Sequence, residues 1–319
     1  MPSVSWSKSK EPTAVTKTQE VFDRMVAAYE GGNVGARPSL HSYMALMTAV
    51  IRSGADDSAE RAEGVLEKMF EAYEDGNRSA KPNALAMTLV IDAWAKSGAR
   101  EGGERAESLL NRMIDLFESG KDDSFKPNEV SFSATMNAWA KARVFGKAVK
   151  ARAVLDRMVE MYETGRLEAK PNTLIYTTLL NACAYAVGDS VEKIEAFQIA
   201  TEAFKELCRS KYGIPNHVTY SAFITACRNL LPEGDSRTQS VAAVFHKCCK
   251  DGQLDKLIVH RVESVMTPVQ LQEMFGCAVG ENGKVNLQLL PEDWTRNVKK
   301  SSFRRKKSSF RRGPTNKRP

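Results

Sequence analysis

The polar and apolar positions of this chain follow one pattern that returns every 44 or 45 residues. After each proline of the series Pro38, Pro82, Pro127, Pro171 and Pro215, apolar residues recur at three- and four-residue spacing, as in ALAMTLVIDAWAKSG and HVTYSAFITACRNL. That spacing predicts an amphipathic helix. A short polar link then leads to a second amphipathic segment, such as AERAEGVLEKMFEAYEDG. Each period therefore predicts a pair of helices.

Further positions keep the same period, which makes the repeat secure. An asparagine follows four of the prolines and is expected to cap the first helix of its pair: Asn83, Asn128, Asn172 and Asn216. The second helices carry a methionine (Met25, Met69, Met113, Met158) and a glycine seven residues later (Gly32, Gly76, Gly120, Gly165). We expect each glycine to end its helix in the left-handed conformation. Small alanines (Ala62, Ala106, Ala151) are expected to let the paired helices approach closely.

One helix pair cannot bury its own apolar faces, but stacked neighbours can, so the pattern predicts an all-α solenoid of helix-turn-helix repeats. The expected segments are an N-terminal segment 1–37 with an unpaired second helix, five repeats (38–81, 82–126, 127–170, 171–214, 215–251), a helical cap 252–298 and a basic tail 299–319. In the cap, LDKLIVHRVESVM and VQLQEMFG predict two helices, breakers in the next segment exclude a long third helix, and Trp294 is expected to anchor LPEDW on the last repeat.

Charge changes this picture only at the C-terminus. Eleven basic residues and no acidic one lie between residues 296 and 319, so residues 1–295 carry a net charge of −4 although the chain carries +7. The argument from basicity to nucleic acid therefore applies to the tail alone. Its duplication SSFRRKKSSFRRG is expected to be disordered and to contact RNA nonspecifically; a nuclear localisation signal or a solubilising role are open alternatives.

Candidate chemistry in the repeats is sparse. The six cysteines include no CxxC pair, the four histidines are scattered, and no phosphate-binding or nucleophile motif is present. We therefore expect a binding protein rather than an enzyme, without cofactor or metal, in a thiol-reducing compartment inside the cell. With 42% hydrophobic and 27% charged residues, and no apolar stretch near the ~18 residues of a membrane helix, we expect no membrane partner.

Segments such as KPNEVSFSATMNAWAKA, KPNTLIYTTLLNACAYA and IPNHVTYSAFITAC resemble the start of pentatricopeptide repeats. The resemblance covers roughly residues 15–250, but these repeats are longer than is usual in the family, with the surplus in the link and at the end of the second helix. It implies a right-handed α-solenoid that binds single-stranded RNA at one nucleotide per repeat, in organellar RNA processing, stability or translation. The implied location is mitochondrion or plastid; no clear transit peptide is present, and cytoplasm and nucleus stay open.

The family uses three positions per repeat for RNA, and the resemblance carries them onto this chain. Residues that flank the base are Leu85, Val130, Leu174 and Val218; residues that read its edge are Thr88, Ser133, Thr177 and Ser221; the third position is held by Asn128, Asn172 and Asn216. The first repeat departs from this pattern with His41 and Met44. In the family a hydroxyl paired with asparagine favours adenine, so the resemblance implies an A-rich register.

Each of these residues also has a simpler interpretation. The asparagines can be helix caps only, the aliphatic residues first-turn packing, and the hydroxyls packing between helices; Trp94 and Trp139 are expected in the core. The acidic net charge counts against RNA, although Lys96, Lys141 and Arg228 are placed to line one edge of a groove. The rival hypothesis is a protein-interaction scaffold that holds a peptide or partner helix. The RNA interpretation requires the four hydroxyls to line an open surface.

Overall fold

The computed structural model describes residues 14–120 and 122–298. The first part of the N-terminal segment and the basic tail lie outside the described residues. Within them the chain is helical, and the only β pairing is an isolated bridge between Val279 and Val285. The chain divides into two compact units, one up to Arg237 and one from Thr238, so the boundary falls inside the fifth expected repeat.

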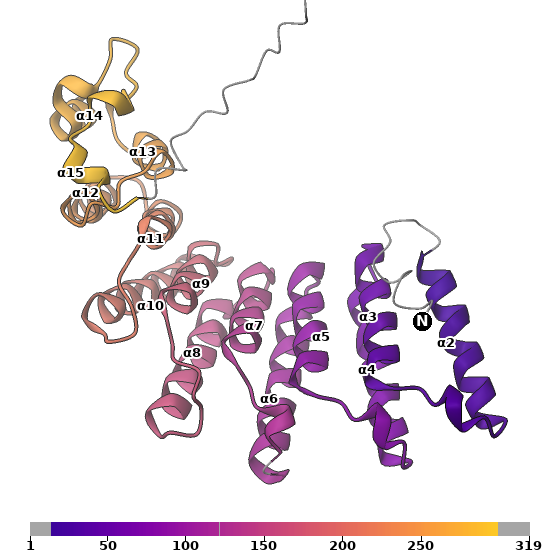
Figure 1. Cartoon of the computed structure of the whole chain (residues 1–319). Coiled ribbons are helices and arrows are strands. Elements are labelled where there is room, and N and C mark those ends of the chain that lie inside the picture. Colours follow the sequence, from indigo (N-terminus) through magenta and orange to yellow (C-terminus); the bar gives the residue numbers. More distant parts are fainter. Residues whose placement is uncertain (1–13, 121, 299–319) are drawn as a thin grey trace, which may run out of the picture. The chain divides into compact units, whose positions relative to one another are not determined.

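Every helix expected in the first unit is present (Figure 1). The first helices of the pairs are α3 (Leu40–Ser53), α5 (Ala84–Ser97), α7 (Glu129–Lys141), α9 (Thr173–Ala184) and α11 (His217–Leu230). The second helices are α4 (Ser58–Glu74), α6 (Gly102–Gly120), α8 (Lys147–Glu163) and α10 (Ser190–Arg209), and α2 (Ala14–Glu30) is the unpaired second helix. The apolar period thus predicted both the number and the order of these helices.

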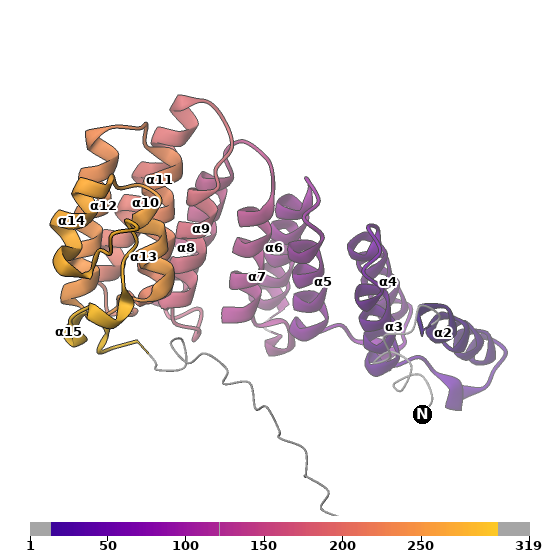
Figure 2. The same ribbon diagram turned by 90° about the horizontal axis from the view of Figure 1, so that it is seen from above.

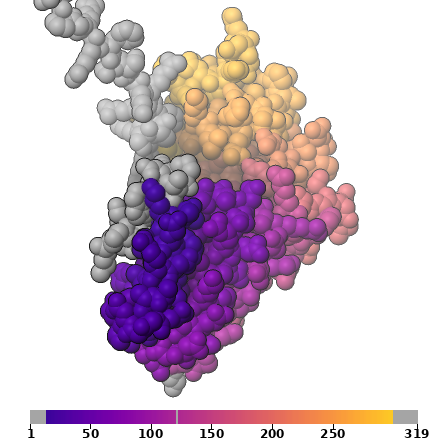
Figure 3. Space-filling view, turned by 90° about the vertical axis from the view of Figure 1, so that its right-hand side faces the viewer, coloured from indigo at the N-terminus to yellow at the C-terminus, as the bar shows by residue number. Residues whose placement is uncertain are grey.

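The helices pack in sequence, each pair against the next (Figure 2). First helices contact first helices, from α5 to α11, and α3 meets α5 over a smaller area. Each second helix packs on the first helix of its own pair and on that of the following pair. Seen from the side of α2, the surface passes from this indigo helix to the violet and pink helices that follow (Figure 3). The alanines at the pair contacts, Ala62, Ala106 and Ala151, are fully buried, as expected.

The loop from each second helix to the next pair repeats a local structure. After α2, α4 and α6 a short 3₁₀ helix follows: η1 (Val34–Ala36), η2 (Arg78–Ala80) and η3 (Asp123–Phe125). Gly32, Gly76 and Gly165 adopt the left-handed conformation expected of them, with φ of 94°, 98° and 73°. α6 ends at Gly120 as expected, but the expected left-handed conformation is wrong there, because Gly120 is the last helical residue and has no positive φ. The extra length of these repeats therefore lies in long second helices and compact loops.

The second unit contains α12 (Asp235–Lys250), which begins just before the boundary, α13 (Lys256–Glu263), α14 (Pro268–Phe275), η4 (Gly276–Ala278), η5 (Leu287–Leu289) and α15 (Glu292–Thr295). Trp294 packs edge-on against Phe245 of α12, with ring centroids 5.7 Å apart, and its carbonyl accepts a hydrogen bond from Leu254. The prediction that Trp294 anchors the LPEDW segment is confirmed.

Candidate functional site

The residues three, ten and fourteen positions after the proline form a stripe on the solvent side of the first helices α3, α5, α7 and α9, whereas in α11 the middle residue of this set, Thr225, is buried. Spacings of seven and eleven residues bring side chains to nearly the same side of a helix with 3.6 residues per turn. In α7 the stripe consists of Val130, Asn137 and Lys141, all exposed. Four of these helices thus carry an aliphatic residue near their start, α3 carries His41 there, and the later positions are mainly polar. We call this set of residues the first-helix stripe.

The aliphatic members of the stripe are the four residues expected to flank a base. Leu85, Val130, Leu174 and Val218 are 46–64% exposed, and they occupy the same position on four first helices that contact one another in sequence. The first-turn packing interpretation fails for them, because such exposed side chains contribute little to the core. In the first repeat His41 is exposed at this position.

The four hydroxyl residues are placed differently from the expected open row. Thr88, Thr177 and Ser221 are only 3–7% exposed, and Ser133 alone is half-buried. Thr177 Oγ1 lies 2.8 Å from Thr219 Oγ1 of the next first helix and donates to the Thr173 carbonyl. The expectation that all four line an open surface is therefore wrong, because neighbouring first helices pack closely enough to cover three of them. The condition that the sequence analysis set for RNA reading by these hydroxyls is met at Ser133 alone, so an RNA proposal has to rest on other residues of the first helices.

Two of these buried hydroxyls have no hydrogen-bond partner. Thr88 Oγ1 and Ser221 Oγ are buried without a hydrogen-bond partner. Other buried threonines of the first helices, such as Thr135 and Thr225, donate to the backbone carbonyl four residues earlier. An unsatisfied buried hydroxyl costs about 1–3 kcal/mol. The structure gives no internal compensation for this cost at Thr88 or Ser221.

The asparagines after the prolines are N-caps. The Oδ1 atoms of Asn83, Asn128, Asn172 and Asn216 each accept a hydrogen bond from a backbone N–H in the first turn of their helix. The capping interpretation is confirmed. It leaves the side-chain amide nitrogen of Asn128 and Asn172 directed away from this bond and able to donate elsewhere.

Fewer unpaired cations lie along the stripe than the sequence predicted. Lys96 is exposed and forms an ion pair with Asp92 on its own helix, and Lys141 is exposed and forms no ion pair within the described part of the chain. Arg228 lies thirteen residues after its proline, outside the stripe; it is half-buried, and its Nε donates to Asn229 Oδ1, 3.2 Å away. The sequence analysis missed the polar middle of the stripe, Asn137 and its equivalents, although the seven-residue spacing could have revealed it.

The titratable groups of the repeats have structural roles. Burial raises the pKa of the Cys183 and Cys227 thiols to about 12, and burial lowers the pKa of Lys147, whose Nζ donates to the Ala140 carbonyl at the end of α7. Residues 14–120 and 122–298 hold no cluster of histidine, cysteine or carboxylate groups that could bind a metal ion. In the same residues no helix combines the length and apolarity needed to cross a bilayer.

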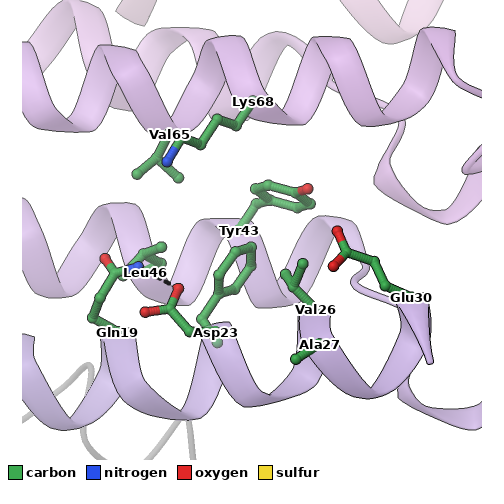
Figure 4. Close-up of a pocket in the computed structure, with 10 residues that line it drawn as sticks. Gln19, Asp23, Val26, Ala27, Glu30, Tyr43, Leu46, Val65 and Lys68 are labelled. Carbon is green, nitrogen blue, oxygen red and sulfur yellow. Dashed lines mark hydrogen bonds between the residues drawn. The ribbon is translucent and has the colours of Figure 1, made fainter. Parts of the chain in front are cut away.

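A cavity of about 350 Å³ lies at the N-terminal end of the first unit, between α2, α3 and α4 (Figure 4). Phe22 and Leu46 form part of its apolar lining, and Asp23 accepts a hydrogen bond from Gln19 at its rim. Lys68 occupies the position where later repeats place Arg112 and Arg157, which join neighbouring second helices. The lining combines apolar, acidic and basic groups without a nucleophile beside a base.

Comparison with known proteins identified no relative: no family model and no curated protein matches the chain.

Proposed function

We propose that the first unit is a pentatricopeptide-like α-solenoid that binds single-stranded RNA along the first-helix stripe, at one nucleotide per repeat. The observation that carries this proposal is the row of exposed aliphatic side chains at one position of four consecutive first helices. An isolated exposed aliphatic residue is ordinary, but a periodic row is not. A role in organellar RNA processing, stability or translation rests on the resemblance of the repeats alone.

An aliphatic side chain on each side suits a base, whose faces are flat and apolar. Packed helices lie about 8–10 Å apart, which leaves room for one base between side chains of neighbouring helices. Covering part of an exposed Leu174 or Val130 in this way removes apolar area from water at about 25 cal/mol per Å². This contact is tolerant of sequence, because every base has such a face.

Base selection in this proposal depends on the hydroxyls and the asparagines. Ser133 is the accessible hydroxyl, and with Asn172 of the next repeat it forms the pair best placed to meet a base edge. Thr88 Oγ1 is covered by the neighbouring helices, so this residue is not expected to contact a base. Thr177 already has two partners, so its repeat is expected to select least. The A-rich register is proposed mainly for Ser133 with Asn172.

Electrostatic attraction to the repeats is expected to be weak. Residues 1–295 carry a net charge of −4, and among the described residues the stripe cations Arg52 and Lys141 form no ion pair, whereas Lys96 pairs with Asp92. For single strands, each phosphate contact contributes a slope of about −0.7 to the dependence of log K on log salt concentration. Replacing Lys141 by Gln should therefore reduce the slope by about that amount.

Fluorescence anisotropy of the full chain with labelled A-rich and C-rich RNA oligomers tests the proposal. The double variant Val130→Asp/Leu174→Asp should bind A-rich RNA at least about tenfold more weakly, since each lost 1.4 kcal/mol is a factor of ten. Val269→Asp, an equally exposed valine in the second unit, is the matched control and should bind as the parent does. Unchanged affinity of the double variant, with binding left to the basic tail, would refute the proposal.

Burial of three of the four hydroxyls favours a second candidate, a scaffold that holds a peptide on the same aliphatic row. Apolar side chains of an extended or helical peptide can cover Leu85, Val130 and Leu174 without any base-edge partner. In the RNA titration described above, this alternative predicts that Val130→Asp/Leu174→Asp changes the affinity for neither A-rich nor C-rich RNA.

A further inference from the structure

A second group of exposed apolar side chains lies where the first helix turns into the second helix in the third and fourth pairs. Its members, which we call the turn patch, are Phe145, Val149, Val187, Val191 and Ile194. Phe145 and Val191 are 74% and 72% exposed. None of these residues belongs to the first-helix stripe, so the proposed function does not explain them.

The two turns of the patch are in direct contact. The Gly146 N–H donates to Glu192 Oε1 over 2.8 Å, which joins the turn before α8 to the start of α10. A β-carbon placed on Gly188 would lie 3.0 Å from Phe145 Cδ1, so the Phe145 ring reaches the turn between α9 and α10. The apolar side chains of the two repeats therefore form one continuous surface.

The patch departs from the pattern of the chain's own repeats. The residue two positions before the buried alanine of the second helix is Glu60 in the first pair and Glu104 in the second, but Val149 and Ile194 in the third and fourth. Glu60 and Glu104 stand in the first turn of their helices, where a negative charge contributes about 0.3–1 kcal/mol. The third pair has no acidic residue in the first turn of α8, the fourth keeps Glu192 in that of α10, and both expose an aliphatic side chain at the position of Glu60 and Glu104.

Charges of opposite sign flank the patch on its two sides. Residues 130–155 contain five basic residues and no acidic one, and among them Lys141, Arg143 and Lys150 are exposed beside the third-pair turn. On the fourth-pair side Asp189 and Glu195 are exposed. A two-fold axis through the patch would place the basic side of one copy against the acidic side of the other, as an isologous interface requires.

The apolar area fits such an interface. The five side chains expose on the order of 500 Å², which exceeds what scattered surface residues provide and approaches the apolar share of a standard interface of about 800 Å² per partner. We propose that the turn patch binds a second copy of this chain about a two-fold axis. This inference does not depend on RNA binding; if both hold, the dimer doubles the number of repeats that a strand can contact.

Light scattering during size-exclusion chromatography of the full chain, loaded at about 1–100 µM, tests the inference through mass action. The mass should rise from 35.3 kDa toward twice that value as the concentration increases. Val191→Glu/Ile194→Glu should stay at the monomer mass. Ile214→Glu, a matched control at a residue 76% exposed outside the turn patch, should dimerise as the parent does. A parent that is monomeric throughout, or a dimer indifferent to Val191→Glu/Ile194→Glu, would overturn the proposal.

A charge exchange tests the two-fold arrangement separately. Arg143→Glu should weaken dimerisation at least about tenfold, and adding Glu195→Arg should restore it, because each side of the patch then again meets the opposite charge. Far-UV circular dichroism should show the parental helix content in all variants. Failure of Glu195→Arg to restore the dimer in folded protein would overturn the two-fold arrangement.

Discussion

Gly103 offers the sharpest test of how the repeats are packed. It lies near the start of α6, and the Trp139 ring of α7 rests directly on its backbone: a β-carbon built on Gly103 would lie 2.6 Å from Cδ2 and 2.8 Å from Cζ3 of that ring. Trp139 is buried, and its Nε1 donates to Glu107 Oε2 over 3.1 Å. Replacing Gly103 by Ala therefore pushes the indole away from both the helix and its acceptor.

The two effects of Gly103→Ala have opposite signs. Alanine gains up to about 1 kcal/mol over glycine in a helix, and less near the helix start. Against this, the added methyl group overpacks a rigid contact, at a cost of about 1–3 kcal/mol, and loss of the Trp139 hydrogen bond adds about 1 kcal/mol. We expect a net destabilisation of about 1–4 kcal/mol, which lowers the thermal midpoint by about 2–16 °C in a unit of this size.

Gly64→Ala is the matched control. Gly64 is exposed in the interior of α4, and a β-carbon there would have no atom within 4 Å. The same substitution should therefore raise the midpoint, through a gain of about 0.5–1 kcal/mol. Thermal unfolding followed by circular dichroism measures both variants, and tryptophan fluorescence reports any movement of Trp139. A Gly103→Ala variant as stable as the parent would refute the packing of α7 on α6 described above.

Three further outcomes follow from the structure. In native protein near pH 7–8 only the exposed Cys208 and Cys277 should react quickly with a thiol reagent, because the other four thiols are buried; six should react in denaturant, as counted by mass spectrometry. The hydrogen bond from Lys81 lowers the pKa of Asp122 from 3.8 to about 2, so the carboxylate's stabilising contribution is present above about pH 4 and is lost as pH falls toward 2. In Lys81→Ala, NMR titration should show this pKa moved upward. Asn172→Ala should lower stability by about 1 kcal/mol through loss of its cap, whereas Asn172→Ser should retain most of it, as thermal unfolding of the two variants would show.

The sequence predicted the helices well because their determinants are local. Apolar spacing, the Pro-Asn start and the buried alanines all lie within one repeat, and the structure places helices and caps where these signals indicate. The expected left-handed conformation is absent at Gly120, the last residue of α6, because glycine permits that conformation but does not require it.

The turn patch could not be predicted from any single repeat. Its sequence signal is visible only when equivalent positions of different repeats are compared. Val149 and Ile194 are ordinary helix residues by composition, and each is compatible with a buried position. They become unusual only beside Glu60 and Glu104 in the equivalent positions, and only once exposure is known. Periodicity aligns these residues, but packing decides which of them face water.

The four hydroxyl residues of the first helices show what the helical period alone does not predict. Residues three and six positions after the proline differ by about 60° around a helix with 3.6 residues per turn. Thus Leu174 points to solvent while Thr177 turns toward α11 and meets Thr219 there. Whether a residue 60° from an exposed stripe is open or covered depends on the distance to the neighbouring first helix, which no pattern within one repeat determines. In the third pair Ser133 is half-buried at this position and stays partly accessible to a ligand, so the proposed base selection should be strongest at that repeat.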